Sequence, residues 1–331
     1  MTALSVAAVL MLWPTVASAG QSQAGAAQAW KAPRTADGQP DLQGVWDFRS
    51  LTPLERPREL AEKDTLSDAE AARFEQERLA EIAARDVEVP ADVVGNYNQF
   101  WFDRGTTVVG SRRTALIVDP ADGRMPPLTP EAQQRETAIT EARKGVGPDE
   151  PTGGGWMEEL GPGNLRVRCI LGFNSGPPMA PSAYNNNVQL FQSAGSVAIL
   201  NEMNHNVRIV PLDGRPFGNI PQWVGESRGR WEGETLVVET RNFLRETAFS
   251  NGKTTKNLQL TERFTRVDPE TLLYEFTVED PTVWTRPWTA AVEMKMNSER
   301  LYEYACHEGN YGLESILSGA RAKEREAAKK Q

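Results

Sequence analysis

The carboxyl-terminal half of the chain alternates short apolar stretches with turn residues. The stretches are rich in Val, Leu, Ile, Thr and aromatic residues, and they recur from residue 187 to residue 306. Between them lie turn signals such as Ala194-Gly195, Glu232-Gly233 and Asp268-Pro269-Glu270. Regularly spaced short strands are typical of an antiparallel meander that closes into a barrel or sandwich. We therefore predict a mainly β protein, built on an antiparallel calycin- or lipocalin-like β-barrel.

The amino-terminal half carries helical patterns instead. Ser67 is followed three residues later by Glu70, which is the spacing of a capping box, and a thin apolar stripe continues until Pro90. Thr129 and Pro130 are the residue types of a helix cap and a first helical position. These patterns predict a helical and irregular extension wrapped on the barrel.

Five segments follow from these patterns. They are a signal peptide at residues 1–19, a disordered linker at 20–36, a helical and irregular wrap at 37–165, the barrel at 166–314 and a polar helix at 315–331. The basic residues of the last segment have the spacing of a solvated helix face rather than of a binding patch.

The first residues have the pattern of an export signal. Residues 3–13 are apolar apart from Ser5, and they run into Ala17-Ser18-Ala19, a typical cleavage site. No Lys or Arg precedes the apolar run, which departs from the usual form. No later stretch approaches the ~20 apolar residues of a membrane span. We expect a periplasmic or secreted protein with no membrane span.

Composition limits the possible binding partners and indicates the state of the two cysteines. The chain has 331 residues and a net charge of −9, which argues against a nucleic-acid partner because phosphate binding needs a concentrated positive surface. The two cysteines, Cys169 and Cys306, are expected to form one long-range disulfide in an oxidising compartment. The alternative is two buried free thiols.

One carboxylate falls on a predicted apolar strand face. Alternation along a strand places Glu262 on the same side as Leu258, Leu260 and Phe264. A buried carboxylate must be paired or keep its proton. A structural salt bridge with Arg208 or Arg286 is therefore the favoured interpretation, and a catalytic role for Glu262 is the alternative.

Both histidines are predicted at strand ends, in polar segments. Alternation from His205 places His205, Val207 and Ile209 on the inner face and Arg208 on the other. A further strand is predicted at residues 300–306, with Tyr302, Tyr304 and Cys306 on a core face. It runs into the dense polar segment His307-Glu308-Gly309-Asn310-Tyr311.

Histidine is the usual acid–base residue near neutral pH, so these two are the candidate proton-transfer pair. Glu308 or Glu262 would orient or tune one of them. The candidate substrate-binding residues are Tyr184, Asn186, Arg208, Trp284, Asn310 and Tyr311.

The sequence lacks the usual motifs of a metal site or of an organic cofactor. His205 and His307 with Glu202 or Glu308 could form a facial triad, but the spacing has no strong signature. Dinucleotide, phosphate-loop and haem-attachment motifs are absent from the sequence. We predict no metal and no cofactor.

Several motifs together resemble a known group of proteins. They are Asp37-Gly38-x-Pro40-Asp41-Leu42-x-Gly44-Val45-Trp46, Tyr184-Asn185-Asn186-Asn187, His205-x-x-Arg208-Ile209, Asp213-Gly214-Arg215, Gly229-Arg230-Trp231-Glu232-Gly233, Glu262-Arg263-Phe264 and Tyr304-x-Cys306-His307-Glu308-Gly309-Asn310-Tyr311. The combination is similar to a large family of exported bacterial proteins that are labelled hypothetical or uncharacterised. The resemblance implies export and a common fold, and it implies no activity.

Three functional hypotheses follow from the sequence. The first is an exported, cofactor-free acid–base enzyme (a lyase, isomerase or hydrolase) acting on a small aromatic or sugar-derived compound. The second is a non-catalytic barrel that binds a small hydrophobic ligand. The third is an envelope interaction protein with a large exposed apolar patch. Convergence of the histidines favours the first, and an apolar cavity favours the second.

Overall fold

The computed structural model describes residues 30–85, 102–142, 144, 165, 168–172, 174–244 and 254–329. The chain divides into two units, residues 1–30 and 31–331, and the described elements belong to the second. The predicted signal peptide and the first part of the predicted linker lie outside the described residues.

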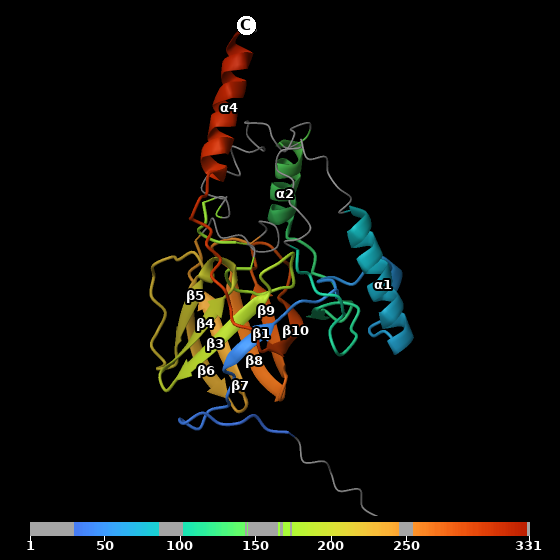
Figure 1. Ribbon diagram of the computed structural model, residues 1–331, viewed down its shortest axis with the longest axis vertical. Helices are drawn as coiled ribbons and strands as arrows, with labels where there is room; N and C mark the ends of the chain where they lie inside the picture. The colour runs from blue at the N-terminus through green and yellow to red at the C-terminus, as the bar shows by residue number, and fades with distance from the viewer. Residues whose placement is uncertain are drawn as a thin grey trace, which may run out of the picture. The chain divides into compact units, whose positions relative to one another are not determined.

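Strands make up most of the regular structure (Figure 1). They are β1 (Gly44–Asp47), β2 (Ile117–Asp119), β3 (Asn187–Ser193), β4 (Ser196–Asn201), β5 (Val207–Pro211), β6 (Glu226–Glu232), β7 (Thr235–Arg241), β8 (Gln259–Asp268), β9 (Thr271–Glu279) and β10 (Trp288–Asn297). The helices are η1 (Arg58–Leu60), α1 (Asp68–Arg85), α2 (Pro130–Ala142), η3 (Met203–His205) and α4 (Gly312–Lys329).

All these strands belong to one antiparallel sheet of ten strands. Strands β3 to β5 form one meander and β6 to β10 form another, while β1 lies between β3 and β10 and pairs with both. Trp46 of β1 is opposite Val188 on one side and Met296 on the other. This short strand from the predicted wrap therefore joins the two meanders that form the sheet.

The two edges of the sheet, β5 and β6, approach each other without forming a ladder. At Gly229 of β6, an added Cβ would lie 2.8 Å from Val210 and 2.6 Å from Leu212, so only glycine allows this close approach. The prediction of a mainly β antiparallel fold is confirmed. Hydrogen bonds do not close the sheet among the described strands, so a barrel is not established.

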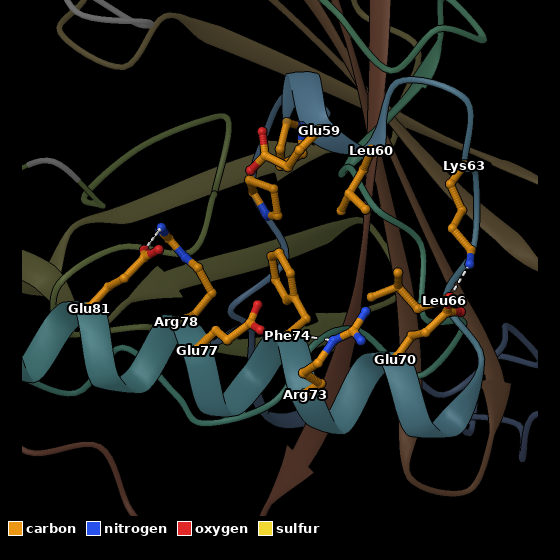
Figure 2. A pocket seen from close by; sticks show the side chains of 12 residues that line it. Glu59, Leu60, Lys63, Leu66, Glu70, Arg73, Phe74, Glu77, Arg78 and Glu81 are labelled. Atoms are coloured by element: carbon orange, nitrogen blue, oxygen red, sulfur yellow. Dashed lines mark hydrogen bonds and ion pairs between the residues drawn. The ribbon is translucent and has the colours of Figure 1, made fainter.

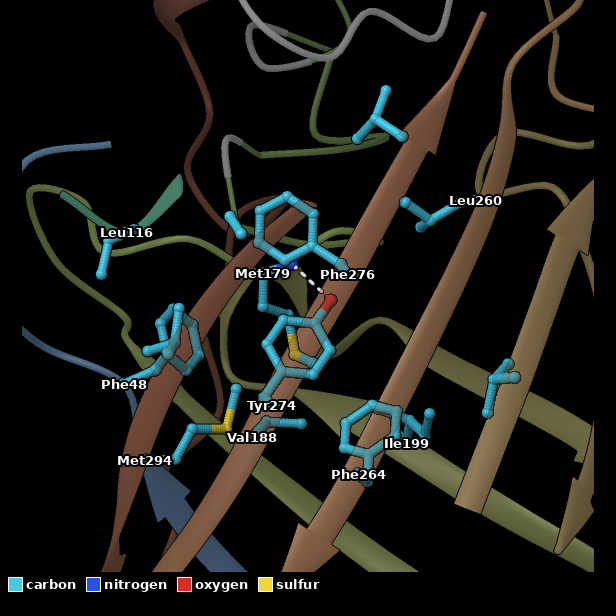
Figure 3. Packing of buried hydrophobic residues seen from close by; sticks show 14 of the residues in the cluster. Phe48, Leu116, Met179, Val188, Ile199, Leu260, Phe264, Tyr274, Phe276 and Met294 are labelled. Carbon is cyan, nitrogen blue, oxygen red and sulfur yellow. Dashed lines mark hydrogen bonds between the residues drawn. The ribbon is translucent and has the colours of Figure 1, made fainter. Parts of the chain in front are cut away.

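Aromatic side chains fill the inner face of the sheet (Figure 3). The ring centroids of Phe264 and Tyr274 are 4.9 Å apart, those of Tyr274 and Phe276 are 5.6 Å apart, and those of Phe276 and Trp288 are 5.9 Å apart. These spacings are typical of favourable ring packing. Each of these four side chains is fully buried, so apolar burial is the main contribution to the stability of the sheet.

The predicted helix starts are confirmed. The Ser67 amide donates to Glu70 Oε2 at 2.9 Å, and the Glu70 amide is 3.4 Å from Ser67 Oγ, which is a capping box at the start of α1. At the start of α2, Thr129 Oγ1 accepts a hydrogen bond from the Ala132 amide at 3.2 Å. The last helix, α4, begins at Gly312, three residues before the predicted start.

The predicted inner face of β5 is wrong. Val207 and Ile209 are exposed, whereas Arg208 and Val210 are buried. His205 lies in the η3 turn with a backbone φ of 48°, so the strand alternation does not extend back to it. Arg208 turns inward because a buried carboxylate faces it across the interior of the sheet.

The predicted strand at residues 300–306 is also wrong. The sheet ends at Asn297, and residues 301–306 form no ladder. Tyr302 is 79% exposed and is therefore not a core residue. This segment is held by contacts to other loops, which are described below, rather than by strand pairing.

Candidate functional site

A buried ion pair crosses the inner face of the sheet. Arg208 Nη1 is 2.6 Å from Glu262 Oε2, and Arg208 Nη2 is 2.9 Å from Glu262 Oε1. The two side chains are 2% and 0% exposed. Two parallel charge-assisted hydrogen bonds are the strongest arrangement for such a pair. The structure therefore confirms the salt bridge with Arg208; Arg286 pairs with Asp119 instead.

Polar groups complete the surroundings of this ion pair. Tyr274 donates its phenolic hydrogen to Glu262 Oε1 at 2.8 Å. The hydroxyls of Ser227 and Thr240 each lie 3.4 Å from Arg208 Nη1. Burial first, and then the Glu262 charge, raise the pKa of Tyr274 well above its ordinary value. Both Glu262 oxygens are thus engaged within the fold.

The same tyrosine links the interior to a loop. The Met179 amide donates to the Tyr274 oxygen at 3.1 Å (Figure 3). Met179 is itself fully buried in the core. The loop that runs from Asn174 to strand β3 is therefore anchored to the centre of the sheet.

The predicted substrate-binding Asn186 is a structural residue of this loop. It is fully buried, and its Nδ2 donates to the carbonyls of Asp103 at 2.8 Å and Ser182 at 3.1 Å. Its Oδ1 accepts from the Ser182 amide at 2.8 Å and from Asn174 Nδ2 at 3.1 Å. All four hydrogen-bonding positions of the amide are occupied, so Asn186 has no capacity left for a ligand.

His205 sits in a strained turn at one end of the sheet. Asn204 and His205 have φ values of 57° and 48°, which non-glycine residues seldom adopt. Glu202 holds the base of this turn, because its Oε2 accepts hydrogen bonds from the Asn187 amide at 3.1 Å and side chain at 2.9 Å. Strain of this kind often accompanies functional sites.

Several buried polar side-chain atoms at and beside this turn have no hydrogen-bond partner among the described residues. Asn201 is fully buried, and neither its Oδ1 nor its Nδ2 has a hydrogen-bond partner among the described residues. Asn204 Nδ2 and Asn206 Oδ1 are buried without a partner in the same part of the structure. Unsatisfied buried polar atoms are rare in folded proteins, so three such residues around His205 require an explanation.

A hydrogen bond joins the two histidine-containing segments. The Tyr304 amide donates to His205 Nδ1 at 3.0 Å. Two residues further on, Cys306 forms the predicted disulfide with Cys169, which is confirmed. Asn310 Nδ2 also lies 3.1 Å from Cys169 Sγ. Residues 306–311 are therefore attached at two points to the loop that contains Cys169 (the 169 loop). His307, Glu308, Asn310 and Tyr311 are exposed.

The two histidines differ in their hydrogen bonding and in their exposure to solvent. An amide N–H can only donate, so His205 Nδ1 accepts, and the neutral ring carries its hydrogen on Nε2. His205 is thus presented as a hydrogen-bond donor. The His307 ring is exposed to solvent. No hydrogen bond joins the two rings in the part of the chain that the structure describes.

The three predicted aromatic contacts differ in accessibility. Trp284 is 3% exposed and packs edge-on against Trp288 with the ring centroids 5.7 Å apart, so it belongs to the core. Tyr184 is half-buried, and its ring centroid lies 6.5 Å from that of Phe102. Of the predicted aromatic contacts, Tyr184 and the exposed Tyr311 are accessible to a ligand.

Sequence reasoning missed the residues that connect the interior to the loops. Tyr274 shares the inner face of β9 with Leu272 and Phe276, and strand alternation could have placed it near Glu262. The contact of Met179 with Tyr274 is made by its backbone amide, which no side-chain pattern can signal.

A groove lies along α1, apart from the histidines. Its volume is about 470 Å³, and it runs between α1 and the chain around η1 (Figure 2). Its lining includes none of the residues predicted for the site.

Neither the comparisons with known proteins nor the arrangement of potential metal ligands assigns a function to this chain. No protein-family model, curated protein or solved structure matches this chain. Function is therefore inferred from the residues and their geometry. Within the described ranges, no three His, Cys, Asp or Glu side chains are grouped to hold a metal ion. None of the helices described has both the length and the apolar character needed to cross a membrane.

Proposed function

We propose that this protein is an exported, cofactor-free acid–base enzyme that acts on a small, sugar-derived compound. The site is formed by the His205 turn and residues 306–311. The observation that carries the proposal is the hydrogen bond from the Tyr304 amide to His205 Nδ1, because it connects two residues that are 99 positions apart and lie in segments that each contain a histidine. The signal-peptide pattern and the disulfide, which is compatible with an oxidising compartment, support a periplasmic or secreted location.

Each histidine has a separate role in this proposal. His205, with Nδ1 occupied, presents Nε2–H to a substrate oxygen and polarises it. His307 is exposed and takes up or delivers the proton. Glu308, which has no partner among the described residues, is the adjacent carboxylate that can orient the His307 ring.

The substrate class follows from the unused hydrogen-bonding groups. Asn204 Nδ2 and Asn206 Oδ1, which belong to half-buried residues beside His205, are an amide donor and an amide acceptor that no described residue satisfies. A polyhydroxylated molecule supplies both complementary types. Because Trp284 is packed in the core, a flat aromatic ligand has less support than a sugar-derived one.

The two alternative functions have less support. A hydrophobic ligand inside the sheet would compete with Phe264, Tyr274 and Phe276, which already fill the inner face. An interaction protein is supported by the exposed Phe191 and Ile209, which lie in one row across the outer face of β3 to β5. Scattered exposed apolar residues are normal on protein surfaces, so this row does not outweigh the histidine arrangement.

The test is a comparison of variants on mixed small metabolites. Wild type, His307→Ala and His205→Ala would be incubated with periplasmic extracts and followed by mass spectrometry, with Tyr302→Phe as a control from the same segment. We expect wild type and the control to consume the same compound. Loss of the proton-transfer group in His307→Ala should slow this reaction by about 10²–10⁴-fold. Equal turnover by all four proteins would contradict the proposal.

A further inference from the structure

The groove along α1 is a second concave site with its own chemistry. One wall is α1, which contributes Phe74, and the other wall carries Glu59 and Leu60 (Figure 2). A volume of about 470 Å³ falls in the range of small-molecule pockets. No residue of this groove takes part in the proposed histidine site.

The apolar part of the groove lies between these walls. Phe74 and Leu60 are half-buried, Leu66 is 5% exposed, and Pro53 and Pro57 complete the apolar lining. Such a floor favours a ligand with an apolar or aromatic body, because each contact removes apolar surface from water.

The charges around the groove are balanced except at one position. Every basic residue in the lining forms an ion pair with a lining acid, and these pairs are Lys63–Glu70, Arg73–Glu77 and Arg78–Glu81. Both carboxylate oxygens of Glu70 are engaged, because Oε1 pairs with Lys63 and Oε2 accepts hydrogen bonds from the Ser67 amide and hydroxyl. Glu59 is the fourth acid of the lining, and it has no hydrogen bond or ion pair among the described residues.

From this arrangement we infer that the groove binds a small organic amine with an apolar or aromatic body. Its ammonium group pairs with Glu59, and its body packs on Phe74 and Leu60. An anionic ligand is disfavoured because four lining acids face three bases, and every base is already paired. The net charge of −9 on the whole chain acts in the same direction.

Binding of matched probes to the full mature protein tests this inference. The probes are 2-phenylethylamine, the neutral 2-phenylethanol and the anionic phenylacetate, with affinities measured by calorimetry or ligand-observed NMR. We expect the amine to bind about two- to fivefold more tightly than the alcohol, as an exposed ion pair allows, and phenylacetate to bind most weakly. The preference should shrink as salt is raised.

Variants separate the charge from the apolar contact. Glu59→Gln should make amine and alcohol equal, while Phe74→Ala should weaken both. Glu62→Gln removes an exposed carboxylate that does not line the groove, so it should keep the preference. Equal binding of amine and alcohol to wild type, a preference that survives Glu59→Gln, or no binding of any probe would each overturn the inference.

Discussion

At the residue scale, the best-defined polar feature is the carboxylate of Glu262 at the centre of the sheet. Moving an ion from water into a protein interior costs roughly several kcal/mol unless oppositely charged or hydrogen-bonding groups compensate for the lost hydration. Here Arg208 supplies two charge-assisted hydrogen bonds and Tyr274 a third. The ion pair thus fixes the position of Arg208. It also fixes the start of β5, which directly follows the His205 turn.

The first prediction concerns removal of one partner of this pair. Arg208→Met or Glu262→Leu leaves the other charge buried and unpaired, so each should lower the free energy of unfolding by roughly 3–5 kcal/mol. The double variant removes both charges and should be more stable than either single variant. Urea unfolding of the four proteins measures this, and additive losses in the double variant would contradict it.

The second prediction concerns the hydroxyl of Tyr274. Tyr274→Phe removes a donor to Glu262 and leaves the Met179 amide without its acceptor, so it should cost roughly 1–3 kcal/mol of unfolding free energy. The folded-state pKa of Tyr274 is raised, so its neutral form is favoured by folding. That contribution is present below the ordinary tyrosine pKa near 10 and declines as pH rises toward the folded-state pKa.

Unfolding curves across this pH range provide the control. The difference in stability between wild type and Tyr274→Phe should be constant in the neutral range and become smaller above about pH 10. A difference that grows with alkaline pH would show that the hydroxyl ionises more easily in the folded protein, contrary to the geometry.

At the element scale, local signals predicted the helices well. The Ser67 and Glu70 capping box and the Thr129 cap are interactions between residues three positions apart, so the sequence alone defines them. The strands from β6 to β10 were also predictable, because period-two alternation and turn residues repeat along each hairpin.

Where the sequence prediction is wrong, contacts between residues far apart in the sequence determine the structure. The inward face of β5 is fixed by the ion pair between Arg208 and Glu262, which are distant in sequence. Residues 301–306 have strand-like composition, but the Tyr304 contact with His205 and the Cys306 disulfide hold them outside the sheet. Pattern analysis cannot weigh such contacts, because they depend on the completed topology.

The third prediction belongs to the first turn of α1. The hydrogen bond from Lys63, followed by that from the Ser67 amide, lowers the pKa of Glu70 from 4.5 to about 2. A depressed carboxyl pKa stabilises the folded state above the unfolded-state pKa, and the contribution disappears as pH falls through the folded-state pKa. Thermal melting of wild type and Glu70→Gln should differ at pH 6 and converge between about pH 4.5 and pH 2.

Glu77→Gln is the matched control for that measurement. Glu77 lies on the same helix, but its contact with Arg73 is a solvent-exposed ion pair of 3.9 Å. The melting temperature of Glu77→Gln should follow wild type at every pH. A gap between wild type and Glu70→Gln that persists at pH 2 would rule out the assigned role of Glu70.

At the scale of the whole described unit, a few long-range connections hold the loops near the sheet. Strand β1 joins the two meanders, Met179 attaches its loop to the interior, and the disulfide attaches residues 304–311 to the 169 loop. These connections place the exposed His307 next to a segment that contacts His205. The candidate site therefore depends on tertiary anchors rather than on regular secondary structure.

The fourth prediction tests the disulfide as one of these anchors. Cys169 and Cys306 are 137 residues apart, so replacing both with Ser should lower the free energy of unfolding by roughly 2–5 kcal/mol. Amide exchange in residues 304–311 should accelerate more than exchange in β8 and β9. Uniform acceleration across the chain would mean that the disulfide stabilises the fold without positioning the polar segment.

The most direct test of the central claim is an NMR titration of the two imidazoles. Since the chain has only two histidines, their side-chain signals can be assigned from His205→Ala and His307→Ala. The titrant is the compound that wild type consumes in the metabolite screen. We predict that both signals shift with the same apparent dissociation constant, with His205 in the Nε2–H form. A shift of only one ring, or different dissociation constants, would contradict a single site formed by both histidines.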